Sequence, residues 1–149
     1  RSLGVQVFNN TVYCANAGDR AAAVVDAFHD AKNPIGGWVV RNNVFVAPAD
    51  QPRKLFQERN DAGKQMTFGG NVCVHLTGVP DGDFSGKEPG LKLTGAKPWP
   101  FYAPAGADSF VVDRGVDVGL PFRGKAPDAG AYELDVAAEL GDVPTPDKK

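Results

Sequence analysis

The sequence predicts an all-β chain that winds into a solenoid of short stacked coils. Three stretches of similar pattern recur, each with an apolar residue, two spacers, an Asn and a short β-type run; their asparagines are Asn10, Asn43 and Asn71. This interval is typical of repeat proteins, in which no single coil can bury its own apolar face. The runs Val39–Val40 and Val44–Val46 do not alternate between polar and apolar residues, which indicates heavily buried parallel strands.

The three asparagines are expected at tight bends between strands. Asn tolerates the left-handed backbone conformation better than other non-glycine residues, and its side chain hydrogen-bonds the nearby chain. Asparagines stacked above one another would also form an amide ladder parallel to the backbone ladder. Gly69 and Gly70, directly before Asn71, suit the same bend. The alternative is three unrelated hairpin turns in a β-sandwich, whose strands should alternate cleanly between polar and apolar residues.

The first coil is expected to begin with a fragment over 3–15, in which 3–13 is strand, and to continue with a turn at 16–20. A strand over 22–28 follows. A helix over 19–31 is the competing interpretation, because this stretch is rich in Ala and an Asp at its start could cap it. The sequence Asn-Pro-Ile-Gly-Gly at 33–37 then breaks the chain.

The second and third coils continue with short strands and polar turns. The second is expected to hold strands at 38–40, 44–46 and 54–57, with a loop at 47–52 and a turn at 59–64. The third is expected to hold strands at 65–68 and 72–76. Beyond it we expect a loop over 78–90, strands at 91–93 and 110–113, an irregular aromatic segment at 97–107, and a charged, partly disordered tail over 135–149.

Length, composition and charge fit a single turn-rich domain. The chain has 149 residues with 18 Gly and 12 Pro, yet 42% of its residues are hydrophobic, which is too many for disorder. The net charge is −2 and the Lys and Arg residues are scattered, which does not favour nucleic acid or an anionic membrane surface. No apolar run approaches the roughly 18 residues of a membrane span. Because strand pattern begins at Leu3, with no initiator Met and no signal peptide before it, we expect a processed chain or a piece of a longer one.

The two cysteines are expected to be free thiols. Cys14 lies four residues after Asn10, whereas Cys73 lies two after Asn71, so they fall in different columns two coils apart. Strands stack about 4.8 Å apart, and two such steps exceed the roughly 7 Å between Cα atoms that a disulfide tolerates. Cys73 is expected in the core.

Most of the chain, over residues 3–133, carries a resemblance to a known group. The stretches VFNNTVY and VVRNNVFV, followed by VDRGVDVGLPFRGKAPDAGAYE at 112–133, resemble the C-terminal part of right-handed parallel β-helix proteins of the pectate-lyase-like superfamily. The terminal pattern consists here of Asp117, Gly119, Pro121, Gly124, Pro127, Asp128, Gly130, Ala131, Tyr132 and Glu133. The resemblance implies C-terminal coils and an irregular closing cap over 1–133, and leaves 134–149 as a flexible tail.

The closing pattern is expected to cap the stack. Gly119 and Gly130 permit close approach or positive φ, and the prolines stiffen the chain. Asp117 and Asp128 are expected to accept hydrogen bonds from amides exposed at the end of the stack. Members of this group usually have more coils upstream. The edge of the first strand, 3–13, should therefore meet either an N-terminal portion of the same protein or a second copy.

The resemblance also implies a chemistry. Polysaccharide lyases of this architecture break uronic-acid polymers by β-elimination, with a cation, often Ca²⁺, to neutralise the carboxylate and an Arg or Lys as base. Hydrolases on the same scaffold use Asp or Glu as acid and base. In this chain the catalytic candidates are His29, Lys54 and Arg59, and the substrate-binding candidates are Asp26, Arg53 and Glu58. The alternative for all six is a solvated charged face. No metal site of the protein's own is predicted.

Other polar and aromatic residues have plain structural explanations beside functional ones. His75 ends a core strand and is expected to be structural or exposed, and the Asp81-Gly82-Asp83 sequence lacks the other ligands of a calcium loop and is expected to be a turn. The aromatic residues could stack on sugar rings or pack under the cap; they are Trp38, Trp99, Phe101 and Tyr102.

The functional expectation is part of a secreted or periplasmic carbohydrate-active protein. The leading hypothesis is a lyase acting on acidic polysaccharide, with most catalytic groups on coils outside this sequence. The rival is a non-catalytic β-helix scaffold for polysaccharide binding, adhesion or assembly.

Overall fold

The computed structural model of the chain describes residues 2–13, 23–28, 35–59, 66–94 and 101–134. The fourteen elements bounded within these residues are all β-strands, and most of them pair in parallel. In this described part no helix is both long and apolar enough to cross a membrane.

Three parallel sheets form the body of the molecule. The first sheet contains β2 (Gln6–Phe8), β6 (Trp38–Arg41) and β9 (Met66–Gly69). The second sheet contains β3 (Thr11–Tyr13), β7 (Val44–Val46), β10 (Val72–Val74) and β12 (Phe84–Ser85). The third sheet contains β4 (Ala23–Phe28), β8 (Arg53–Arg59) and β11 (Leu76–Thr77).

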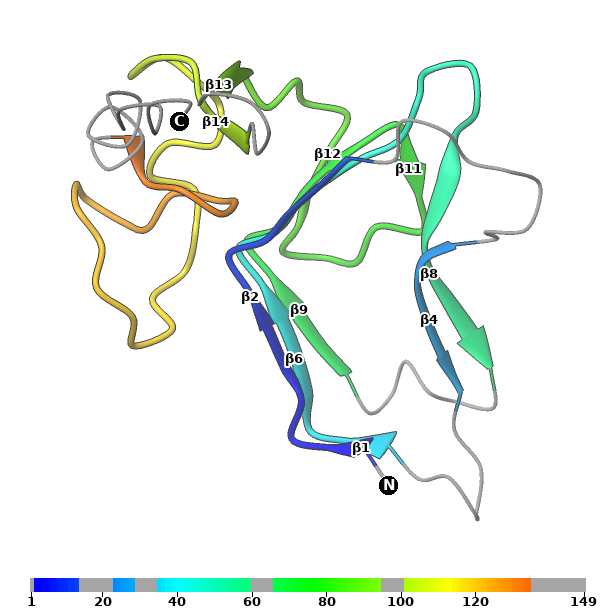
Figure 1. Cartoon of the computed structure of the whole chain (residues 1–149). Helices are drawn as coiled ribbons and strands as arrows, with labels where there is room; N and C mark the ends of the chain where they lie inside the picture. Colours follow the sequence, from blue (N-terminus) through cyan, green and yellow to red (C-terminus); the bar gives the residue numbers. More distant parts are fainter. Residues whose placement is uncertain (1, 14–22, 29–34, 60–65, 95–100, 135–149) are drawn as a thin grey trace, which may run out of the picture.

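The chain runs through these sheets in the same order three times. The first passage is β2, β3, β4, the second is β6, β7, β8, and the third is β9, β10, β11. Figure 1 looks along the direction in which the strands stack, so that β2, β6 and β9 lie almost over one another on one side and β4 and β8 on another. Two small sheets complete the structure: β1 (Ser2–Leu3) pairs in parallel with β5 (Ile35–Gly36), and β13 (Leu91–Thr94) pairs antiparallel with β14 (Phe101–Pro104).

The register aligns the repeated asparagines. Thr11 pairs with Val44 and Val44 with Val72, so the three residues that precede these, Asn10, Asn43 and Asn71, stack above one another. The Oδ1 atom of Asn43 accepts from the backbone and side-chain nitrogens of Asn10, both at 3.0 Å. Asn71 Oδ1 accepts from Asn43 in the same way, at 3.0 and 2.8 Å. The predicted amide ladder is therefore present.

The ladder ends on a carboxylate that the sequence did not single out. Asp83 Oδ1 accepts from the backbone nitrogen of Asn71 at 3.1 Å and from its Nδ2 at 2.9 Å. The last member of the ladder needs only to accept, and a carboxylate does nothing else. The expectation of a plain turn at 81–83 is therefore incomplete. Asn10, Asn43, Asn71 and Asp83 are called the amide ladder below.

The left-handed residue at each bend is the one before the ladder residue. Asn9 and Asn42 have φ values of 53° and 56°, and Gly70 has 70°. The expectation that a ladder asparagine would itself take this conformation is wrong: the ladder residue is held by its side-chain bonds, while its predecessor makes the turn. In each Asn-Asn pair the first residue therefore takes the left-handed conformation of the bend, and the second makes the ladder hydrogen bonds.

The second sheet is buried on both faces, as its uninterrupted apolar runs predict. Phe45 and Cys73 point to an inner core with Val40, Leu55 and others from all three sheets. Their neighbours along the strands point to an outer core, which contains Val44, Val46, Val72, Val74, Val111 and Ala129. The outer core exists because residues after β14 pack against the outer face of this sheet.

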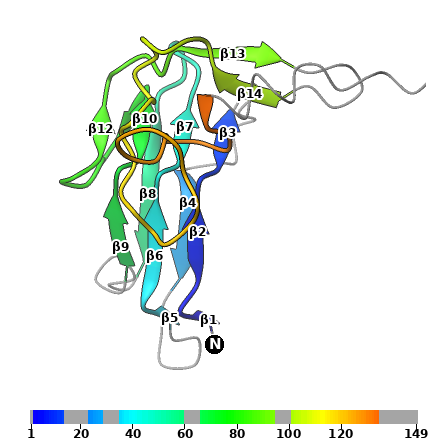
Figure 2. The ribbon, with the colours of Figure 1, turned by 90° about the vertical axis from the view of Figure 1, so that its left-hand side faces the viewer.

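This closing segment, residues 105–134, lies outside the strand stack. In Figure 1 it lies beside the corner where the first and second sheets meet, and in Figure 2 it crosses in front of the stack. Asn42 fixes it there, since its Oδ1 accepts from Val116 N at 2.7 Å and its Nδ2 donates to Val116 O at 2.8 Å. Gly130 N donates to Asn42 O at 2.7 Å. The segment thus covers a side of the stack.

The glycines and carboxylates of the closing pattern serve this packing. Gly130 has φ +104°, and a Cβ there would lie 2.8 Å from Thr11 Oγ1. Gly119 has φ +80°, so both glycines take the predicted positive φ. Asp117 accepts from Gly119 N, and Asp128 accepts from the backbone nitrogens of Asp113 and Leu134. The amides that these two carboxylates bind thus belong to the closing segment itself. The prediction that they would bind amides at the end of the strand stack is wrong.

Several element predictions need correction. The helical alternative for 19–31 is wrong over Ala23–Phe28, which is strand β4 because it pairs with β8. Residues 110–113 form a turn, closed by Val112 N donating to Ser109 O at 3.1 Å, where a strand was expected. The expected loop at 78–90 contains β12, which continues the second sheet.

Cys73 is a free, buried thiol in the inner core, as predicted. Burial, reinforced by the charge of Asp83, raises the pKa of this thiol to about 12. Cys14 and the predicted tail at 135–149 lie outside the described residues.

Candidate functional site

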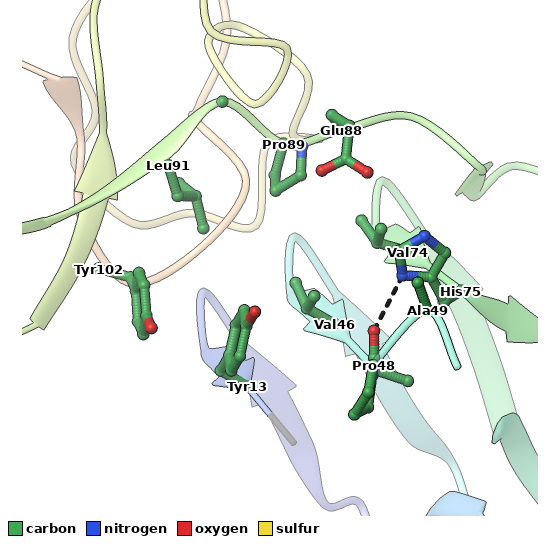
Figure 3. Close-up of a pocket in the computed structure, with 12 residues that line it drawn as sticks. Tyr13, Val46, Pro48, Ala49, Val74, His75, Glu88, Pro89, Leu91 and Tyr102 are labelled. Carbon is green, nitrogen blue, oxygen red and sulfur yellow. Dashed lines mark hydrogen bonds between the residues drawn. The ribbon is translucent and has the colours of Figure 1, made fainter. Parts of the chain in front are cut away.

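The main pocket lies where the strands of the second sheet end and the β13–β14 hairpin begins. It has a volume of about 460 Å³. The lining comes from four separate parts of the chain: Tyr13; Val46, Ala47, Pro48 and Ala49; Val74 and His75; and Glu88, Pro89, Gly90, Leu91 and Tyr102. Figure 3 shows the side chains that surround it.

The parallel register builds one wall of this pocket. Tyr13 pairs with Val46, and Val46 with Val74, so three successive passages each contribute one residue at the same column. The opposite wall comes from Pro89 and Leu91 at the start of the hairpin and from Tyr102 on β14. The pocket therefore forms between the strand ends of the three passages and the β13–β14 hairpin.

Two tyrosines stand side by side at one end of the pocket. The rings of Tyr13 and Tyr102 are nearly parallel, with centroids 5.1 Å apart and an interplanar angle of 16°. Tyr13 is exposed and Tyr102 is partly buried. A stacked tyrosine pair offers a rigid apolar surface with hydroxyl groups at its rim, which suits a ligand that has both an apolar ring face and many hydroxyls.

His75 is held in a defined orientation at the other end. It follows β10 with φ 54°, and its Nδ1 lies 3.0 Å from the carbonyl oxygen of Ala47 (Figure 3). A carbonyl oxygen only accepts, so Nδ1 carries a proton, and in the neutral form of the ring Nε2 is then the acceptor. Within the described residues the ring has no other hydrogen bond. His75 is exposed, as predicted.

Glu88 is the acidic group of the pocket lining. It is exposed, and the described lining residues include no Lys or Arg. These described residues therefore offer a uronate carboxylate no Lys or Arg partner, while hydroxyl groups would find an acceptor in Glu88 and in His75 Nε2. The described residues contain no group of three or more His, Cys, Asp or Glu that could hold a metal ion.

Five of the six candidates from the sequence lie on strands outside the pocket lining. Asp26, on β4, and Arg53, Lys54, Glu58 and Arg59, on β8, belong to the third sheet. In its register Lys54 pairs with Ala23 and with Thr77, Asp26 pairs with Gln57, and Glu58 pairs with Ala27. The structure thus brings these five backbones into one sheet, and none of the five lines the pocket, although Arg53 N donates to the carbonyl oxygen of the lining residue His75 at 3.2 Å. His29 lies outside the described residues.

Carboxylates of the closing segment surround a second, smaller pocket of about 190 Å³. Asp113 Oδ1 accepts from Lys125 N at 2.8 Å and Ala126 N at 3.1 Å, and these two bonds lower the pKa of Asp113. Glu133 Oε1 accepts from Asp128 N at 3.1 Å, but burial raises its pKa. These groups fold the closing segment on itself, which explains their presence without a ligand.

Sequence reasoning missed most of the pocket. Tyr13, His75 and Glu88 are far apart in sequence and share no motif. Tyr102 was predicted either to stack on sugar or to pack, and here it does line the pocket. Trp38 belongs to the same apolar cluster as Phe56 and Met66. The rings of Phe101 and Tyr132 pack together with their centroids 4.3 Å apart. Trp99 lies outside the described residues. The one available signal was the column of residues three positions after each ladder asparagine.

Comparison with known proteins gives no relative. No protein-family model, no curated protein and no solved structure matches the chain.

Proposed function

We propose that the chain forms coils of a right-handed parallel β-helix of the pectate-lyase-like type and binds carbohydrate in the pocket between Tyr13, Tyr102 and His75. The coil architecture is supported by the three ordered passages through three parallel sheets and by the amide ladder. Each passage is then one coil, and residues 105–134 close the side of the stack.

The observation that carries the binding function is the tyrosine pair beside polar acceptors. Sugar rings have an apolar face that packs on aromatic rings and hydroxyls that donate to acceptors. The stacked rings of Tyr13 and Tyr102 supply the first, and Glu88 and His75 Nε2 supply the second. Because the described lining residues include no Lys or Arg, we expect the bound unit to be a hydroxyl-rich, uncharged part of a polysaccharide.

The second candidate function is lyase action on acidic polysaccharide. It is favoured by the third sheet, which carries Arg53, Lys54 and Arg59 on one strand next to Asp26 on its neighbour. In such an enzyme Lys54 or Arg59 would act as base and Arg53 would bind the uronate. Most catalytic groups would then belong to further coils, and the protein would work outside the cytoplasm, secreted or in the periplasm.

Titration with oligosaccharides tests the binding function. The chain is titrated by calorimetry with a neutral cello-oligosaccharide and with an oligogalacturonate, and Tyr13→Ala and Tyr102→Ala are compared with wild type. Loss of one aromatic contact worth about 0.5–1.5 kcal/mol predicts a two- to tenfold weaker Kd for the neutral ligand. Phe122→Ala is the control, since Phe122 is exposed and outside the pocket.

The results separate the two functions. Unchanged affinity in both tyrosine variants contradicts binding in this pocket. A rise in ultraviolet absorbance from unsaturated ends during incubation with polygalacturonate supports the lyase, and its loss in Lys54→Ala would place the reaction on the third sheet. Absence of that signal, with binding retained, favours the scaffold.

A further inference from the structure

The strands of the first passage share one open edge. β1, β2, β3 and β4 each occupy an outer position in their sheet, so within the described residues each is paired on one side only. These four strands are called the N-terminal edge. Two described contacts reach it from later in the chain: the Tyr102 ring of β14 stacks on Tyr13, and the backbone nitrogen of Ala131 in the closing segment donates to Thr11 Oγ1. Along this edge the outward backbone N–H and C=O groups of the four strands therefore have no described strand partner and can pair with another strand.

Burial decreases toward this edge along two columns of the second sheet. In one column Cys73 is 0% exposed, Phe45 2% and Val12 37%. In the next, Val74 is 2% exposed, Val46 7% and Tyr13 50%. The side chains of the first passage thus have the positions of core residues without the cover that the later passages have.

The amide ladder has a direction. Each member donates its backbone N–H and its Nδ2 group to the Oδ1 of the next, from Asn10 toward Asp83. Asn10 Nδ2 uses its second hydrogen on Phe8 O at 2.8 Å. What Asn10 presents at the open edge is therefore an acceptor, its Oδ1. The neighbouring Asn9 also has a buried Oδ1 with no hydrogen-bond partner among the described residues.

This polarity decides which occupant fits. Two copies joined edge to edge would bring two Oδ1 acceptors face to face. A copy stacked head to tail would place its Asp83 above Asn10, and that carboxylate also only accepts, while the Asp83 N–H is already bound to Pro80 O. Neither arrangement of a second copy continues the ladder. An asparagine in a strand bend of the same direction does so.

We propose that the N-terminal edge is the docking surface for one preceding coil, which runs parallel to the first passage and carries an asparagine directly above Asn10. The proposal rests on the coil architecture proposed above, and it selects a preceding coil over a second copy. This coil would donate two N–H groups to Asn10 Oδ1, pair with β2, β3 and β4, and bury Val12.

Hydrogen exchange of edge amides tests this in the chain as it stands. Val39 N and Val44 N donate to the preceding strand, so by the repeat the Gln6 and Thr11 amides face the open edge. We expect both to exchange at the rate of open amides at every protein concentration. Protection of both in this chain would overturn the proposal: protection that grows with concentration means a second copy, and protection lost on deleting 135–149 means the chain's own tail.

An added coil supplies the positive test. Residues 35–65 are copied directly before Val5, which keeps the spacing because Gln6 pairs with Val39 and Val39 with Thr67. The copied Asn then stands above Asn10, and the matched control has Asp at that one position. In the Asn version we expect the Gln6 and Thr11 amides to exchange at least tenfold more slowly than in the Asp version. We also expect the Asn version to have the higher urea midpoint.

Equal protection and equal midpoints in the two extensions would overturn the ladder argument. If the extensions fail to fold, the exchange experiment on the unextended chain still decides whether the edge is open. Neither readout involves saccharide, so failure of this proposal leaves the pocket standing, and failure of the pocket leaves this proposal standing.

Discussion

Replacing Asn43 by Ala removes the central member of the amide ladder. Asn43 is 0% exposed, and its side chain makes five hydrogen bonds to described residues: it accepts two from Asn10 and donates to Val7 O, Arg41 O and Asn71 Oδ1. These bonds use one acceptor oxygen and two N–H groups. At about 1 kcal/mol net for each of these three groups, the loss is about 3 kcal/mol, before any cost of the small cavity.

Urea unfolding measures this loss. With a slope near 2 kcal/mol per M, a loss of 3 kcal/mol lowers the midpoint by about 1.5 M. Asn10→Ala is the matched control, because Asn10 is exposed and water can replace its partners, so we expect about 1 kcal/mol or less. The reasoning is refuted if the two variants lower the midpoint equally with unchanged slopes.

Three further predictions concern the ladder end, the inner core and the closing segment. Burial raises the pKa of Asp83, although the hydrogen bonds from Asn71 act in the opposite direction, so folding disfavours the ionised form of this carboxyl. The stability that the protonated carboxyl contributes is therefore complete below the pKa of Asp83 in the unfolded chain, and it is lost as the pH rises through its pKa in the folded chain. Asp83→Asn should therefore flatten the pH dependence of the urea midpoint above pH 4, and an unchanged profile would contradict this. Cys73, with its pKa raised to about 12, should resist a thiol reagent at pH 8 in a Cys14→Ser background and react fully in urea; fast native labelling would show that the inner core is open. Gly130→Ala should destabilise by more than Gly119→Ala, which costs about 1–2 kcal/mol from backbone strain alone, because only at Gly130 would the Cβ meet Thr11 Oγ1 at 2.8 Å and Val44 Cγ2 at 3.2 Å; equal thermal shifts would mean that the closing segment is not held at this contact.

The local repeat was readable from the sequence because each passage repeats the same physical task. An asparagine before an uninterrupted apolar run predicted the alignment of Asn10, Asn43 and Asn71 and the burial of β7 and β10 on both faces. The sequence did not predict that Asn9 and Asn42 would make the bends, since either residue of an Asn-Asn pair can take the left-handed conformation. Asp83 was missed because the ladder ends on a different residue type.

The candidate site was not predictable in the same way. The pocket arises where residues 88–91 and Tyr102 of the β13–β14 hairpin fold back onto passages that are tens of residues away in sequence. Charged residues on β8 attracted attention because they are chemically versatile, yet the structure places them on another sheet. Residues such as Tyr13 and His75 gain a role only through the register, which places them at the strand ends beside Tyr102 and Glu88.

The most direct test of the stacked passages is the detection of ladder hydrogen bonds by NMR. Couplings across hydrogen bonds are measured between each ladder backbone nitrogen and the side-chain carbonyl or carboxyl carbon of its acceptor. The structure predicts three connections, from Asn10 to Asn43, from Asn43 to Asn71 and from Asn71 to Asp83, with N···O distances of 3.0, 3.0 and 3.1 Å. Assigned amides that show none of these couplings, or that couple to other partners, would contradict the ladder and with it the parallel stacking of the three passages.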